Sequence, residues 1–204
     1  YSPTSRPGTR SPSSPGGSVE QPVSPALFAL GAGARFVARA IDTLQKHLVE
    51  VLKQAHAHRG ASFVEIFQNC IVYNDEVFAG FTAKSVAQEA QIHVEHGRPL
   101  AFAGGRRGLR LAPGKLDLQA VRLGEDGVTE ADILIHDEAN RTLATMLAAM
   151  QPPALPMALG VLYRNPGSSL DTSLHAADGR QNALPSCEDL NALLRRGDTW
   201  TVAG

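Results

Sequence analysis

The sequence predicts an α/β fold of the doubly wound kind. Apolar residues at helical spacing run from Leu44 to Ala55, and Gly60 follows them as a stop signal. Residues 62–67 are too few for a helix, are rich in Val, Ile and Phe, and barely alternate with polar residues. That pattern is typical of a strand buried on both faces of a parallel sheet. A helix, a glycine and a buried strand make up half of a doubly wound unit.

Two shorter elements precede this unit. Residues 26–30 predict a helix, Gly31 and Gly33 interrupt it, and residues 35–38 predict a strand. Asp42 is expected to cap the next helix, because a carboxylate there can accept hydrogen bonds from the free backbone N–H groups of the first turn.

A hairpin is predicted in the middle of the chain. Residues 109–111 and 116–123 alternate apolar with polar residues around Pro113 and Gly114, which favour a turn. The stretch between Cys70 and residue 100 shows no such regularity, and we expect it to pack outside the main sheet.

A helix and a strand are predicted towards the C-terminus. The helix occupies the second half of residues 129–150, and residues 157–163 predict the last strand. The stretch "IHDEAN" at residues 135–140 should supply acidic residues to the first turn of this helix. From Asn165 onward we expect a polar tail. Core spacing within the helix is shown by Leu143, Met146, Leu147 and Met150.

Composition narrows the class of protein. Hydrophobic residues make up 43% of the 204 residues, which suffices for a sizeable core. The net charge of −1 argues against nucleic acid or an acidic membrane as the main partner. No apolar run is long enough to span a membrane, because Arg35 and Arg39 interrupt the best candidate. Two distant cysteines, Cys70 and Cys187, argue against a disulfide-stapled secreted protein, so we expect a cytoplasmic one.

The first 25 residues are dense in Ser, Pro and Gly. This composition is typical of a linker or a disordered arm. It is also compatible with an ordered loop over a ligand, in which Gly16, Gly17 and the hydroxyls of Ser14 and Ser18 present donors to an anion. The residues alone leave both readings open.

Cys70 follows the predicted buried strand at the edge where ligands gather in open α/β sheets. It could be a small buried thiol, a nucleophile activated by one of the seven histidines, or a metal-cluster ligand. An iron–sulfur cluster needs about four thiolates, which this chain cannot supply alone. Glu65 lies in the strand that precedes Cys70. If its carboxylate is buried it needs a hydrogen-bonding or charged partner, and the alternative is an exposed position at the edge of the sheet. The pair His56 and His58 is interpreted as cations at a helix C-terminus.

Residues 57–75, "AHRGASFVEIFQNCIVYND", resemble the beta subunit of 2-oxoacid:ferredoxin oxidoreductases, in particular its 2-oxoglutarate branch. The resemblance covers nearly the whole chain, and it is weakest at residues 81–123 and 171–189. Further stretches that resemble this family in the same order are "YSPTS" at 1–5, "GS" at 17–18, "IHDE" at 135–138, "GVLYR" at 160–164 and "GDTWTV" at 197–202.

The resemblance implies the C-terminal part of a thiamine-diphosphate-binding doubly wound fold with a mixed α+β C-terminal extension. It implies an enzyme that decarboxylates a 2-oxoacid, transfers the acyl group to coenzyme A and passes electrons through a [4Fe-4S] cluster to ferredoxin. Thiamine diphosphate, Mg²⁺ and the cluster are the implied cofactors, and an alpha subunit is the implied partner. Cys70 resembles the last cluster ligand. The residues implied to line the cofactor are Tyr1, Ser2, Pro3, Thr4, Ser5, Gly17 and Ser18.

The chain also departs from the family. The family's Gly-Asp-Gly motif with paired asparagines and its other three cluster cysteines have no counterpart here, so we expect a fragment that is inactive in isolation. Two alternatives remain, an inert fragment that only binds the alpha subunit and a Cys/His hydrolase. The expected organisation is a cofactor-proximal loop at 1–25, half of the thiamine-binding domain at 26–80, the extension at 81–166 and a tail at 167–204.

Overall fold

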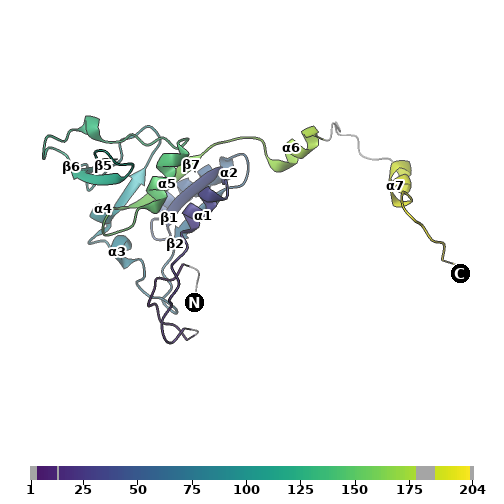
Figure 1. Ribbon diagram of the computed structural model, residues 1–204, viewed down its shortest axis with the longest axis horizontal. Helices are drawn as coiled ribbons and strands as arrows, with labels where there is room; N and C mark the ends of the chain where they lie inside the picture. The colour runs from purple at the N-terminus through teal and green to yellow at the C-terminus, as the bar shows by residue number, and fades with distance from the viewer. Residues whose placement is uncertain (1–3, 13, 178–186, 203–204) are drawn as a thin grey trace. The chain divides into compact units, whose positions relative to one another are not determined.

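The computed structural model describes residues 4–12, 14–177 and 187–202 (Figure 1). The chain divides into two compact units, Tyr1–Gly167 and Ser168–Gly204. The first unit contains a mixed four-stranded sheet and a small antiparallel three-stranded sheet within its described residues. None of the described helices is long and apolar enough to cross a membrane.

The main sheet has the strand order β2-β1-β7-β3. Its outer pairs, β1 with β2 and β3 with β7, are parallel, whereas the central pair of β1 and β7 is antiparallel. Both central strands are almost completely buried, as expected from their continuous apolar sequences. The bounds are β1 (Phe36–Ile41), β2 (Phe63–Phe67), β3 (Gln91–Val94) and β7 (Met157–Arg164).

Apolar clusters cover both faces of this sheet. On one face Val37 and Leu162 pack with residues of α1 (Pro25–Gly31) and α5 (Arg141–Ala149). On the other face Phe36, Ala38 and Val161 pack with Val51 of α2 (Gln45–Ala57). Successive side chains of β1 therefore point to opposite faces of the sheet and pack into two different apolar clusters. Helices on both faces make an α/β arrangement, as predicted, in a sheet of mixed direction.

The small sheet confirms the predicted hairpin. Strands β5 (Arg107–Leu111) and β6 (Leu118–Arg122) pair antiparallel, and Gly114 in the turn has φ +70°, a conformation that favours glycine. Strand β4 (Ala101–Phe102) completes the sheet. The remaining short helices of this unit are α3 (Ala79–Thr82), α4 (Ala87–Ala90) and the 3₁₀ turn η1 (Glu130–Asp132).

Two predictions about the main sheet are wrong. Strand β2 lies at the edge of the sheet, so it is not buried on both faces, and Ile66 is 42% exposed. The stretch between Cys70 and residue 100 does not lie wholly outside the sheet, because it contributes the opposite edge strand β3. A four-residue strand that pairs with a partner more than 60 residues away has no local sequence signal.

Two predictions about helix caps are also wrong. Asp42 does not cap α2, since its Oδ1 accepts from the neighbouring Thr43 N–H at 2.7 Å and the helix begins three residues later. The acidic residues of "IHDEAN" lie before α5 and not in its first turn. The cap of α5 is Asn140, whose Oδ1 accepts from Leu143 N–H at 3.0 Å.

The second unit contains two short helices where a polar tail was predicted. These are α6 (Leu170–Ala177) and α7 (Cys187–Leu194). Leucines at helical spacing, including Leu170 and Leu174, are exposed in this unit. The apolar side chains therefore do not form a core of their own among its described residues.

A buried ion pair joins the two parallel strands β1 and β2. Arg39 and Glu65 face each other in register, and Arg39 Nε donates to Glu65 Oε2 at 2.7 Å. The side chains are 2% and 14% exposed. The guanidinium also lies 3.7 Å from the sulfur of Met157 on β7 and 5.8 Å from the ring centre of Phe67. One arginine thus contacts three strands or their ends.

Removing one member of this pair should strongly destabilise the fold. We expect Arg39→Met or Glu65→Gln to lower the free energy of unfolding by about 3–5 kcal/mol, because the remaining group would be buried without its partner. The double variant Arg39→Met/Glu65→Leu should lose much less, since no buried charge remains. Urea denaturation measures all three variants. Equal losses for the single and double variants would contradict the ion-pair explanation.

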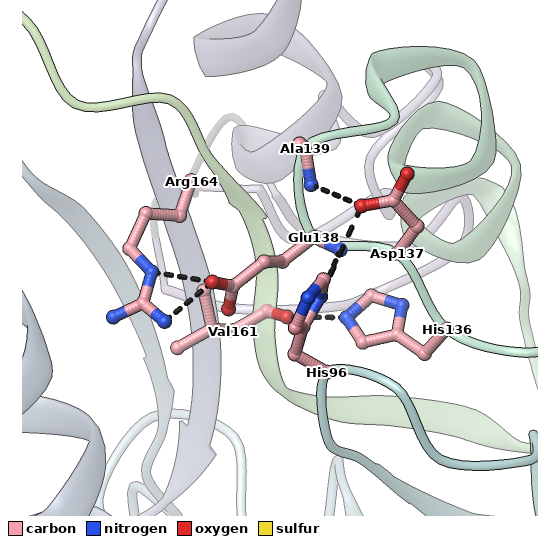
Figure 2. A network of polar contacts seen from close by, with 7 residues as sticks. All are labelled: His96, His136, Asp137, Glu138, Ala139, Val161 and Arg164. Carbon is pink, nitrogen blue, oxygen red and sulfur yellow. Dashed lines mark hydrogen bonds and ion pairs between the residues drawn. The ribbon is translucent and has the colours of Figure 1, made fainter.

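A second polar network ties the segment before α5 to β7 (Figure 2). Glu138 accepts from Arg164 Nε at 2.6 Å, and its backbone carbonyl accepts from Arg164 N–H at 2.7 Å. His136 is 1% exposed and hydrogen-bonds through Nε2 to the carbonyl oxygen of Val161 at 2.8 Å (Figure 2). Its Nδ1 is buried without a partner. Burial lowers the pKa of His136 below its ordinary value of 6.5.

This burial predicts a loss of stability in mild acid. The unfolded imidazole titrates near pH 6.5 and the folded one at lower pH, so below pH 6.5 the unfolded chain binds more protons and gains on the folded state. The free energy of unfolding should therefore fall as the pH drops through that range. We expect His136→Gln, which keeps a donor to Val161, to reduce the fall, whereas His56→Gln on the exposed surface of α2 should not. Denaturation curves across this pH range measure how steeply the free energy of unfolding falls. The same slope in wild type and His136→Gln would show that His136 is not the cause.

Candidate functional site

A cleft of about 1070 Å³ opens at the C-terminal end of β2. Its walls come from the first 25 residues, from the loop and helix that follow β2, and from the end of α5. Ligands of open α/β sheets gather at the carboxyl ends of strands, so the cleft has the expected position. Residues with polar side chains in its wall include Thr4, Ser5, Arg6, Thr9, Ser11, Ser18, Ser24, Gln68, Cys70, Asn74 and Gln151.

The cleft also has an aromatic wall beside the ion pair. The rings of Phe67, Phe78 and Phe81 contact one another with centres 5.1–5.8 Å apart. All three line the cleft, together with Met157 and the pair of Arg39 and Glu65. Aromatic side chains in mutual contact make a rigid, water-excluding surface. The lining of the cleft thus combines hydroxyl groups with these aromatic rings.

The Ser/Pro/Gly-rich segment is an ordered loop in its described part. Gly8 N–H donates to the carbonyl of Ser18 at 2.7 Å, and Ser18 N–H donates to that of Thr9 at 3.0 Å. Gly17 has φ +93°, and a Cβ there would lie 3.3 Å from Gly8 Cα. The close approach of two backbone segments therefore requires glycine at this point. The described part of the segment is therefore ordered, and its position over a ligand stays a prediction.

The predicted cofactor-lining residues have different positions. Thr4, Ser5 and Ser18 line the cleft, whereas Gly17 lies where the loop backbone closely approaches Gly8. Ser18 is buried, and its hydroxyl donates to the carbonyl of Arg6 at 2.6 Å. Its hydroxyl hydrogen is therefore used within the loop. The other predicted residues, Tyr1, Ser2 and Pro3, lie outside the described residues.

Cys70 is an exposed free thiol in the wall of the cleft. The reading of a buried, packing thiol is wrong. The backbone N–H groups of Tyr73 and Val72 lower the pKa of the Cys70 thiol by hydrogen bonding, and that of Asn74 adds a smaller effect. These donors favour the thiolate, which is the form that binds metals and attacks electrophiles. Burial, whose effect is larger than that of Asn74, and the nearby Asp75 carboxylate raise this pKa in the opposite direction.

The described residues offer Cys70 few chemical partners. They contain no group of three or more His, Cys, Asp or Glu side chains that could hold a metal ion. No histidine lines the cleft, so the described structure places no imidazole base beside the thiol. His58 of the His56/His58 pair is buried beside the ring of Phe36, with centres 5.3 Å apart. Among the described residues, Cys70 therefore has neither a set of further metal ligands nor a histidine base beside it in the cleft.

Sequence reasoning missed two features of this site. In the sequence, Arg39 was used only to exclude a membrane span. A charged side chain in a buried strand needs a partner, and the pairing of Arg39 with Glu65 was not predicted. The resemblance implied that Asn69, with Gln68, shapes the surroundings of the cluster, but the hydrogen bond at 2.7 Å from Asn69 to Asp75 across the Cys70 loop was not predicted.

Comparisons with known proteins place this geometry in a family context. No protein-family model matches the chain. The 2-oxoglutarate oxidoreductase subunit KorB of Mycobacterium tuberculosis is 34% identical over 207 residues, which cover 99% of this chain and 54% of that protein. The beta subunit of 2-oxoacid:ferredoxin oxidoreductase 1 from Aeropyrum pernix is 39% identical over 80 residues, 39% of this chain and 25% of the relative.

A solved structure has a similar fold. It is the 2-oxoglutarate:ferredoxin oxidoreductase of Magnetococcus marinus, with 2-oxoglutarate, coenzyme A and succinyl-CoA bound. The similarity has a TM-score of 0.60 at 23% identity and covers 98% of this chain and 53% of the other. Almost all of this chain aligns with each of these two proteins, and it spans about half of their length.

Proposed function

Because this chain is a homologue of the beta subunits of 2-oxoacid:ferredoxin oxidoreductases, we propose that it forms part of an enzyme of that kind. The reaction is the oxidative decarboxylation of a 2-oxoacid with transfer of the acyl group to coenzyme A and of electrons to ferredoxin. The name of the Mycobacterium tuberculosis relative and the ligands of the Magnetococcus marinus enzyme favour 2-oxoglutarate as the substrate.

The position of Cys70 in the cleft is the main support for the proposal. An exposed thiol at the end of β2 shares a cleft with Thr4 and Ser5 of the first loop. A cluster ligand must be reachable and must favour the thiolate form, and Cys70 meets both requirements. Cys70 is accordingly proposed as one ligand of a [4Fe-4S] cluster. The other three come from outside the described residues.

The first loop is proposed to lie against thiamine diphosphate. Thr4 and Ser5 face the cleft, and Arg6 adds a positive charge there that can offset diphosphate oxygens. Tyr1, Ser2 and Pro3 are proposed to continue this contact, while Gly17 and Ser18 hold the loop in shape. No group of three acidic or other metal-ligating side chains is present in the described residues, so Mg²⁺ would take its protein ligands from elsewhere.

The chain's own contribution is binding, orientation and exclusion of water. Bound thiamine diphosphate supplies the carbanion chemistry of decarboxylation, and the cluster supplies a one-electron path. The rings of Phe67, Phe78 and Phe81 keep one wall of the cleft apolar. The Arg39–Glu65 pair holds the end of β2 in place beneath that wall. Cys70 then presents its sulfur from a fixed strand end.

The organisation of the whole protein is part of the proposal. Residues 1–25 form the cofactor-proximal loop, 26–80 half of the thiamine-binding domain, 81–166 an extension and 167–204 a tail. The main sheet crosses this division, since β3 and β7 come from the extension. The name "subunit beta" of the relatives implies an alpha subunit as partner. The complex is proposed to act in the cytoplasm, and the isolated chain is proposed to be inactive.

A second candidate is an inert chain that retains only binding to the alpha subunit. It is favoured by the single thiol that the described residues place in the cleft. A Cys/His hydrolase is less well supported, because no described histidine lines the cleft.

Replacing Cys70 tests the proposal. In the gene product that carries this chain, purified without oxygen and reconstituted with iron and sulfide, we expect about four iron atoms per chain. Cys70→Ser should remove most of the iron and the visible absorption, because one thiolate ligand is lost. Cys187→Ser, in the second unit, is the matched control and should retain both. Equal iron in all three proteins would remove Cys70 from the cluster, and absence of iron from the wild type would favour the inert chain.

A further inference from the structure

A buried amide links the aromatic wall of the cleft to the edge strand β3. Gln91, at the start of β3, is 8% exposed, and its Nε2 donates to the backbone carbonyl of Phe81 at 2.6 Å. The last carbonyls of a helix have no partner within that helix, so Gln91 supplies one to α3. This helix has only four residues and no side-chain cap at its start, so it depends on contacts from outside.

Phe81 is a central member of the aromatic wall. It is 2% exposed, and its ring centre lies 5.1 Å from that of Phe67 and 5.8 Å from that of Phe78. All three rings line the cleft. A hydrogen bond that holds the backbone of Phe81 therefore helps to position the whole wall.

The other end of the Gln91 amide faces a histidine. Because Gln91 Nε2 donates to a carbonyl, Gln91 Oε1 is the atom that lies 3.3 Å from His93 Nε2. An amide oxygen only accepts hydrogen bonds, so His93 Nε2 carries the hydrogen in this contact. The Nδ1 atom of the neutral His93 ring is then the site that can take up a further proton.

His93 also contacts a second imidazole. The ring of His47, in the first turn of α2, lies at 88° to that of His93 with centres 4.8 Å apart, and its Nδ1 is buried without a partner among the described residues. Burial lowers the pKa of both histidines below 6.5, the charge of His93 lowers the pKa of His47 further, and the Glu95 carboxylate acts on His93 in the opposite direction. Separated rings therefore bind protons more readily, so the contact is favoured above pH 6.5 and is lost as the pH falls below it.

We propose that the contact between His47 and His93 is a pH-sensitive switch whose state Gln91 transmits to the aromatic wall of the cleft. With both rings neutral, the edge-to-face contact holds His93 where its Nε2 hydrogen faces Gln91. With both rings protonated, two like charges repel each other and the rings separate. Gln91 then loses one of its two partners, and the carbonyl of Phe81 is held less firmly. The switch acts on the wall itself, whichever ligand the cleft binds.

The second charge is the element that opens the switch. A protonated His93 alone would donate more strongly to Gln91, because charge-assisted hydrogen bonds are stronger than neutral ones. The wall should therefore loosen in acid only when His47 is charged as well. This difference separates the switch from a simple titration of His93.

A fluorine label in the wall tests the switch in the 204-residue chain. With 4-fluorophenylalanine at position 78, beside Phe67 and Phe81, the fluorine NMR resonance should shift as the pH is lowered from about 8 to about 5. His47→Phe keeps a ring beside His93 but cannot carry the second charge, so this pH dependence should be lost. His56→Gln, on the exposed surface of α2, is the matched control and should shift like the wild type. A wild-type resonance that stays constant while the NMR signals of both histidines titrate would overturn the switch.

Gln91→Met tests the transmission. Methionine fills a similar volume but makes neither of the two hydrogen bonds of Gln91, so the histidine signals should titrate while the wall resonance no longer follows them. The same shift in wild type and Gln91→Met would show that the amide transmits nothing and would overturn its role. Circular dichroism at each pH separates the local change from global unfolding. If Gln91→Met fails to fold, the loss or persistence of the shift in His47→Phe still decides whether the histidine pair moves the wall.

Discussion

The buried pair of Arg39 and Glu65 is the interaction on which the geometry of the cleft depends. A guanidinium and a carboxylate removed from water require each other, so the pair fixes the register of β1 against β2. A shift of one residue would turn every side chain of β2 to the opposite face. Because Arg39 also contacts Met157 and the ring of Phe67, the same register sets the aromatic wall. The position of Cys70, three residues beyond Phe67, follows from it.

The edge position of β2 explains why the cleft is open. A central strand would have had its end crowded by neighbours on both sides, whereas β2 has β1 on one side only in the described structure. The first loop and the residues after β2 fold over this end and form the walls. Their order comes from local hydrogen bonds, such as that of Ser18 with Arg6 and that of Asn69 with Asp75. A fixed sheet thus carries walls that local polar contacts shape.

Sequence patterns predicted the elements whose signals are local. The periodic apolar residues of α5, the turn at Gly114 and the apolar run of β2 each lie within one short window, and each element is present. The errors concern long-range relations. Strand β3 is recognisable only through its pairing with β7, and the edge position of β2 depends on which strands come next to it. For the site, Cys70 could be singled out because a strand end precedes it. The partner of Glu65 required knowledge of the register.

Exposed apolar side chains lie around the cleft, and they bear on the proposal that Cys70 binds a cluster. Val23, Ile66 and Tyr73 line the cleft and yet are 47%, 42% and 73% exposed. A cluster held by Cys70 needs further thiolates within bonding distance of the same iron atoms, so the polypeptide that carries them must lie against this rim. Such a polypeptide would cover these side chains and remove their apolar surface from water. If Cys70 binds a cluster as proposed, the segment that brings the other ligands would also cover these apolar side chains.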